Sequence, residues 1–94
     1  MNEYEITFIV NPDKEEETGK VLDSVKGFIE KKKGKIKDVN EWGLKKLAYS
    51  IHGYGEGYYT VMNFGLSPDK IDLLRDFIQK NEDILRYILV SKEE

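Results

Sequence analysis

Residues 42–51, WGLKKLAYSI, form a run of apolar and β-favouring residues with a glycine near its start and two adjacent lysines in its middle. It belongs to a longer β-like run over residues 35–51, in which Gly43 predicts a bulge. A Gly-rich segment, HGYGEG at 52–57, leads into a second β-like run, YYTVMNF at 58–64. Two such runs joined by a glycine-rich turn predict a β-hairpin.

The segments before the hairpin predict a strand and then a helix. Residues 4–10, YEITFIV, alternate and are rich in aromatic and β-branched side chains, and Asn11-Pro12 ends the run. Between Asp13 and Lys33, apolar residues recur at spacings of three and four while Lys and Glu fill the other positions. Gly34 supplies a stop, so this segment predicts an amphipathic helix.

The segments after the hairpin repeat this order in reverse. Ser67-Pro68 predicts a helix start, followed by an apolar stripe that ends at Asn81, and ILRYILV at 84–90 predicts a last strand. The β-α-β-β-α-β order predicts an α+β, ferredoxin-like split sandwich: a four-stranded antiparallel sheet with two helices on one face. We expect one domain over residues 1–94.

Composition limits the function classes. The chain has 94 residues, 15 basic and 18 acidic side chains and a net charge of −3, so any nucleic-acid role requires a local basic patch or a basic partner. The absence of cysteine excludes disulfides, thiolate zinc sites and cysteine catalysis. The first residues, MNEYEITFIV, do not resemble a signal peptide, and no apolar run is long enough for a membrane helix. We expect a soluble cytoplasmic protein.

One face of the predicted sheet has no helix to cover it. Alternation places Tyr4, Ile6, Phe8 and Val10 toward the helices. The opposite face then carries Ile9, Tyr59, Val61, Ile88 and Val90, beside Thr7, Asn63 and Arg86. Such an exposed apolar patch predicts a partner-binding surface, although scattered apolar residues are also normal on surfaces.

The lysine pair lies in a strand that we place at the edge of the sheet. Lysines on an edge strand discourage pairing with a second sheet, which is one explanation for Lys45 and Lys46. Neighbouring residues in a strand point to opposite faces, so the two cannot serve one flat surface. A polyanion that wraps around the edge would contact both.

Four segments of the chain resemble those of a known family. The segment GLKKLAYSI at 43–51 is similar to the signature of the bacterial small-subunit ribosomal protein six family, with matches at Gly43, Lys45, Lys46, Leu47, Ala48, Tyr49 and Ile51. YEITFIVNP at 4–12, EGYYTVMNF at 56–64 and ILRYILV at 84–90 resemble other segments of that family in the right order. Ser50 stands where proline is common, and the acidic end Glu93-Glu94 replaces the longer extension of some members.

The resemblance implies a structural component of the bacterial small ribosomal subunit. Members of the family bind the central domain of small-subunit ribosomal RNA as a heterodimer with the small basic ribosomal protein numbered eighteen, and the resemblance implies the same here. Lys and Arg contact phosphates and tyrosines stack on splayed bases, so our RNA-binding candidates are Lys45, Lys46, Tyr49, Arg86 and Tyr4. The competing explanations are that Tyr49 packs within the hairpin, Tyr4 belongs to the rim of the core, and Arg86 pairs with Glu5.

Two other classes fit less well. A stand-alone RNA-recognition motif requires, in its third strand, a basic residue, a glycine, an aromatic residue, a small residue and a second aromatic residue. The segment EGYYT at 56–60 does not fit, because Glu56, Tyr59 and Thr60 stand where the basic, the small and the second aromatic residue are required. A small ferredoxin-like phosphatase requires a basic phosphate cradle after the first strand, where NPDKEEE at 11–17 carries four carboxylates. The single His52 has no nucleophile beside it in the sequence, so we predict no enzyme, cofactor or metal site.

Overall fold

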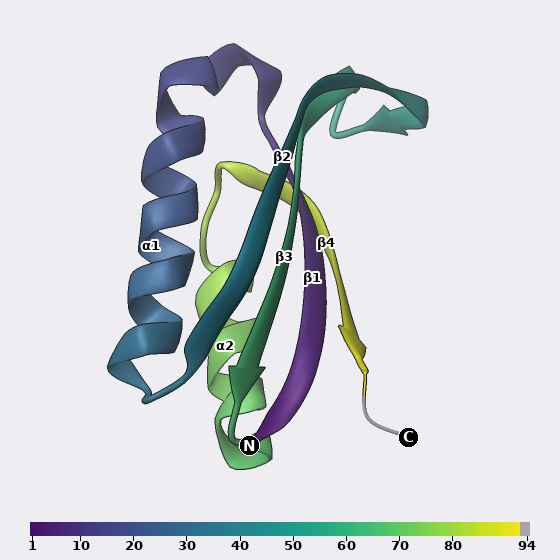
Figure 1. The fold of residues 1–94 in the computed structure, drawn as a ribbon. Coiled ribbons are helices and arrows are strands. Elements are labelled where there is room, and N and C mark those ends of the chain that lie inside the picture. Colours follow the sequence, from purple (N-terminus) through teal and green to yellow (C-terminus); the bar gives the residue numbers. More distant parts are fainter. Residues whose placement is uncertain (93–94) are drawn as a thin grey trace.

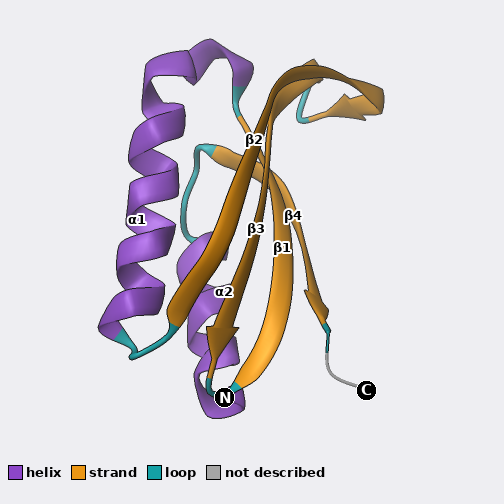
Figure 2. Ribbon diagram, viewed as in Figure 1, coloured by secondary structure: helices purple, strands orange, loops and turns teal. Residues whose placement is uncertain are grey.

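The computed structural model describes residues 1–92 as one sheet with two helices packed on it. The strands are β1 (Asn2–Val10), β2 (Lys35–Ile51), β3 (Tyr54–Leu66) and β4 (Ile84–Ser91), in the antiparallel order β2-β3-β1-β4. The helices are α1 (Thr18–Lys31) and α2 (Ile71–Gln79), and each follows a 3₁₀ turn, Pro12–Glu17 and Pro68–Lys70 respectively. Both helices cover the same face of the sheet (Figures 1 and 2), which confirms the predicted α+β arrangement.

The core lies between this face and the helices. The inward set predicted for β1 is confirmed, because Tyr4, Ile6, Phe8 and Val10 are all buried. The remaining core side chains come from α1, β3 and α2: Val21, Leu22, Val25, Ile29, Met62, Phe64, Leu66, Leu74 and Ile78. Burial of these apolar surfaces is the main force that holds the two layers together.

The hairpin turn is shorter than the sequence suggested. The chain reverses at His52 and Gly53, and β3 already begins at Tyr54, which pairs with Ile51. His52 has φ 52° and Gly53 has φ 84°, as a two-residue turn matched to the twist of the strands requires. The prediction that all of residues 52–57 form a turn is therefore wrong.

The glycine at 57 has a packing role inside β3. A β-carbon placed there would collide with Cγ2 of Ile9 and lie 3.2 Å from the carbonyl oxygen of Val10. Only glycine allows β3 to cross so close to β1 at this point.

Gly43 forms the bulge that the sequence predicted. The β2–β3 register shifts between Glu41 and Gly43, and Gly43 has φ 81°. Beyond this bulge the hairpin bends away from the sheet and curves toward the side opposite the helices (Figure 1). We call residues 44–57 the arm.

The helix ends differ in detail from the sequence prediction. The chain enters α1 through a 3₁₀ turn, in which the side chain of Asn11 accepts a hydrogen bond from the backbone nitrogen of Asp13. The hydroxyl of Ser67 bonds to the carboxylate of Asp69 and makes no capping bond to the backbone. α2 ends at Gln79, two residues before the predicted Asn81. Among the described residues, no helix is both long and apolar enough to cross a membrane.

Candidate interaction face

The centre of the face opposite the helices, which we call the open face, is built by neighbouring side chains of three strands. In the register, Thr7 of β1 lies between Val61 of β3 and Ile88 of β4. Two residues further along β1, on the same face, Ile9 lies between Tyr59 of β3 and Arg86 of β4. Strand pairing therefore places the predicted partner-binding residues in adjacent rows on one surface.

The arm closes over one end of the open face and forms a pocket. The pocket has a volume of about 240 Å³, and its walls come from β1, the arm, β3 and β4: Thr7, Ile9, Leu47, Ala48, Tyr49, Ile51, Tyr59, Arg86, Tyr87 and Ile88. We call it the arm pocket. Nη1 of Arg86 donates a hydrogen bond of 2.8 Å to the Tyr49 hydroxyl across this pocket, between residues 37 positions apart.

This contact brings two of the predicted RNA-binding residues together. Tyr49 keeps 65% of its surface exposed, so its ring remains open to a ligand although its hydroxyl is engaged. The expectation that Arg86 pairs with Glu5 is wrong, because Glu5 lies opposite Val90 and Arg86 lies opposite Ile9. The arm, which alternation cannot reveal, supplies the partner of Arg86.

The predicted partner-binding residues differ sharply in exposure. Ile88 and Val90 are exposed by 53% and 48%, whereas Ile9 and Val61 retain only 7% and 8%. The expectation that Val61 is exposed in the free protein is therefore wrong, although its place on the open face is right. Ile9 is covered because Gly57 packs directly against it.

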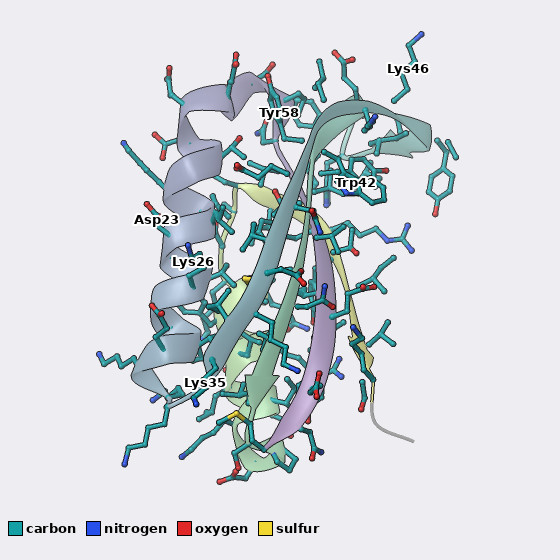
Figure 3. All side chains as sticks on the ribbon, viewed as in Figure 1. Asp23, Lys26, Lys35, Trp42, Lys46 and Tyr58 are labelled. Atoms are coloured by element: carbon teal, nitrogen blue, oxygen red, sulfur yellow. The ribbon has the colours of Figure 1, made fainter. Side chains whose placement is uncertain are left out.

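A tryptophan outside the set of predicted site residues borders the open face. The indole of Trp42 stacks on the ring of Tyr59, with centroids 6.5 Å apart and planes inclined by 9°. Trp42 is nonetheless 57% exposed and lies beneath the arm (Figure 3). Its position next to the Gly43 bulge is the signal that would have pointed to it, because a bulge redirects the neighbouring side chains.

The other RNA-binding candidates separate into two groups. Lys45 and Lys46 are exposed on the arm, and Lys46 projects from its outer side (Figure 3). Tyr4 is only 6% exposed and stacks on Phe64 in the core, with centroids 5.7 Å apart. The assignment of Tyr4 to an RNA surface is therefore wrong, and the alternative that it packs in the core is right.

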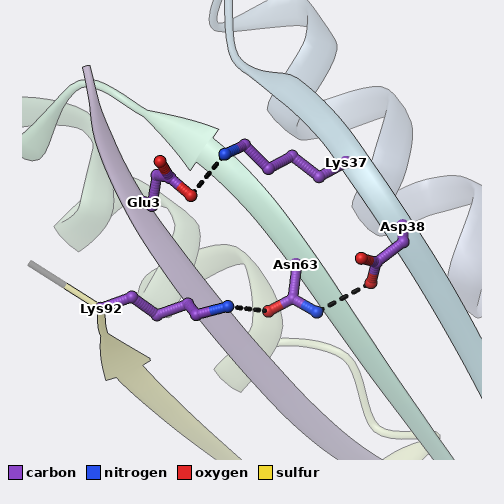
Figure 4. A network of polar contacts seen from close by, with 5 residues as sticks. All are labelled: Glu3, Lys37, Asp38, Asn63 and Lys92. Carbon is purple, nitrogen blue, oxygen red and sulfur yellow. Dashed lines mark hydrogen bonds and ion pairs between the residues drawn. The ribbon is translucent and has the colours of Figure 1, made fainter.

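The other end of the open face is polar (Figure 4). Lys37 pairs with Glu3, and Asn63 donates to Asp38 at 2.7 Å and accepts from Lys92 at 3.1 Å. The ammonium of Lys37 holds the pKa of Glu3 below its ordinary value of 4.5. We call these five residues the polar network, which the apolar periodicity of the sequence does not reveal.

The chemistry of this face is that of binding. Within residues 1–92, no group of histidine or acidic side chains is placed to hold a metal ion. His52 lies at the tip of the hairpin. The face instead offers exposed apolar side chains at β4, an aromatic pair, and a basic arm, which are features of an interaction surface.

Comparisons with known proteins agree with this description. The family model described as ribosomal protein S6 matches residues 3–91. The small ribosomal subunit protein bS6 of Clostridium novyi (strain NT) is 39% identical over 95 residues and is aligned over the full length of both chains. The bS6 protein of Caldanaerobacter subterraneus is 36% identical over 95 residues, again over both full lengths.

A solved structure has the same fold. The crystal structure of 30S ribosomal protein S6 from Thermotoga maritima matches with a TM-score of 0.92 and 34% sequence identity. The match covers 97% of the present chain and 87% of that chain. From the family model, the full-length relatives and this structure together, the chain belongs to the ribosomal protein S6 family and is a protein of the small ribosomal subunit.

Proposed function

We propose that this protein is an architectural component that binds the central domain of small-subunit ribosomal RNA jointly with the small basic ribosomal protein numbered eighteen. The observation that carries the proposal is the arm pocket, where the basic, aromatic arm meets the apolar open face. One ligand surface suits a nucleic acid and the adjoining surface suits a protein, so two partners can be held side by side.

The open face supports the protein half of the proposal. Ile88 and Val90 are exposed, and Tyr59 lies between them and Trp42 on the same surface. Apolar side chains beside aromatic rings are typical of the central part of a protein interface. The net charge of −3 favours a basic partner over an acidic one.

The arm supports the RNA half of the proposal. Lys45 and Lys46 carry exposed ammonium groups, and the exposed ring of Tyr49 offers a stacking surface next to the Arg86 guanidinium. Lysine and arginine neutralise phosphates, and tyrosine stacks on unpaired bases. Because few cations are involved, RNA binding by the chain alone is expected to be weak, and the basic partner supplies the rest.

The experiment that tests the proposal is a binding titration with a central-domain RNA fragment. The titration is run with this chain alone, with the partner alone and with both. We expect weak binding by each protein and tight binding by the pair. Tight and specific binding by this chain alone, or no gain from the pair, would contradict joint binding.

A double variant tests the role of the arm in the same titration. Lys45→Ala with Lys46→Ala is expected to weaken RNA binding by the pair and to reduce the salt slope by at most about two units. Lys20→Ala with Lys80→Ala makes the same change in charge on the helix layer and serves as the control. An unchanged salt slope for the arm variant would favour the explanation that these lysines only protect the sheet edge.

A further inference from the structure

Among residues 1–92, the carboxylates of Glu3, Glu5 and Asp38 lie on the open face, and one of them has no partner. Glu3 pairs with Lys37, and Asp38 accepts a hydrogen bond from Asn63. Glu5 has neither an ion pair nor a hydrogen bond to its carboxylate within the part of the chain that the structure describes. The cations around it on the open face are already engaged. Lys37 pairs with Glu3, Lys92 bonds to Asn63, and Arg86, which lies opposite Ile9, bonds to Tyr49.

The position of Glu5 is at the border between the polar and apolar parts of the open face. In the register it lies between Asn63 of the polar network and Val90, which is 48% exposed. On the same side of β1, Thr7 and then Ile9 follow it toward the arm pocket. Ile9 is four positions beyond Glu5 in extended chain, a distance of about 13 Å.

A partner that covers this border would remove water from the Glu5 carboxylate. Desolvation of an unpaired charge opposes binding, so a neutral or acidic segment would be disfavoured at this position. A lysine or arginine at the same place would pair with the carboxylate and favour the correct partner and register. Glu5 therefore selects the charge of the segment that binds.

We infer that Glu5 is the counter-ion for a lysine or arginine of the protein partner, in an extended segment that crosses the open face and inserts an apolar side chain into the arm pocket. The inference rests on the proposed function, because it concerns the same partner. It adds a definite pattern: side chains of one strand point to the same side at every second residue. Thr7 and Ile9 both line the arm pocket, so the basic and the apolar residue of the segment are two or four positions apart.

The test is a calorimetric titration of the whole chain with the basic partner over a series of salt concentrations. Glu5→Gln keeps the shape of the side chain and removes its charge, and its affinity is expected to fall at least about tenfold. Its affinity should also depend less on salt than that of the wild type. Glu16→Gln removes the same charge from an exposed position on the helix layer and is expected to bind as the wild type does.

A second variant tests the arm pocket. Ala48 lines the pocket, and Ala48→Met places a larger side chain where the partner's apolar residue is expected. Affinity is expected to fall while the salt dependence stays that of the wild type, because the lost contact is apolar. Circular dichroism of the free variant checks that the hairpin is intact.

The outcomes separate the two proposals. A wild-type chain that does not bind the partner would overturn the proposed function and this inference with it. Wild-type binding, combined with equal affinity and salt dependence for Glu5→Gln and Glu16→Gln, would overturn the inference alone. Unchanged affinity for Ala48→Met would overturn the insertion of an apolar side chain.

Discussion

Thr60 is a polar residue enclosed by the core. Its side chain is 1% exposed, and its hydroxyl has no hydrogen-bond partner among the described residues. A buried hydroxyl without a partner retains the cost of losing water, so Thr60→Val is expected to raise the free energy of unfolding by about 1–2 kcal/mol. Urea denaturation provides the measurement, with Thr7→Val on the half-exposed open face as the control. A less stable Thr60→Val variant would show that the hydroxyl is satisfied.

Val61 and Ile88 offer a matched pair on the open face. Both lie opposite Thr7 in the register, yet Val61 is 8% exposed and Ile88 is 53% exposed. Glutamate at position 61 would bury a charge, so Val61→Glu is expected to destabilise the free protein by several kcal/mol. Ile88→Glu leaves its charge in water and is expected to cost less than about 1 kcal/mol. Equal unfolding midpoints for the two variants would contradict this difference in burial.

These two residues also show what alternation predicts and what it does not. A period of two assigns each side chain to a face, and the assignments of Val61, Ile88 and Tyr4 to faces are all correct. Exposure depends on which distant segments fold back over that face. The arm contacts the open face through residues about forty positions away from Ile9, and no local pattern encodes that contact.

The end of α1 is a Schellman motif with an unusual residue in it. The backbone nitrogen of Lys33 bonds to the carbonyl of Glu30 at 3.0 Å, and that of Gly34 bonds to Ile29 at 2.8 Å. Lys33, with φ 68°, occupies the left-handed position that glycine usually fills. Gly34 is needed for a different reason, because a β-carbon there would lie 2.6 Å from the carbonyl oxygen of Gly65.

Exchanging the residue at the left-handed position should therefore stabilise the protein. Lys33→Gly removes the backbone strain of a side chain at positive φ and is expected to raise the free energy of unfolding by up to about 1 kcal/mol. Gly34→Ala is expected to lower it, since the new methyl group collides with backbone atoms. Thermal unfolding of the two variants checks both directions, and a stabilised Gly34→Ala would refute the packing argument.

The elements themselves could be predicted from the sequence, and their ends could not. The period of the apolar residues gave both helices and all four strands in the correct order. The stop at Gly34 and the long turn at 52–57 were placed on glycines that serve close packing or lie within β3. Glycine marks a special position, but the sequence alone does not say whether a turn or a close approach requires it.

The whole molecule is two layers whose free surface divides into two halves. The split β-α-β order fixes the strand order β2-β3-β1-β4, and with it the existence of an open face. The polar network and the arm pocket divide that face, and both depend on side chains that meet only after β2 and β4 join the sheet. The candidate site was therefore predictable as a face but not as a pocket.

The polar network gives the molecule a pH dependence. Because the Lys37 ammonium lowers the pKa of Glu3 in the folded state, the carboxylate form stabilises the fold at neutral pH. This contribution is present above the ordinary value of 4.5 and is lost as the pH falls through the lowered pKa. Thermal unfolding as a function of pH is expected to show a smaller acid loss of stability for Glu3→Gln than for the wild type. Parallel pH profiles for the two would exclude a role for this pair.

The stacked pair of Trp42 and Tyr59 has a practical consequence for spectroscopy. Trp42 is the single tryptophan of the chain, and its ring is 57% exposed at the margin of the open face. Its emission colour and its accessibility to a dissolved quencher depend on water around the indole, so a protein docked on the open face would change both. The molecule thus contains its own fluorescent reporter, and association can be followed in real time without attaching a dye.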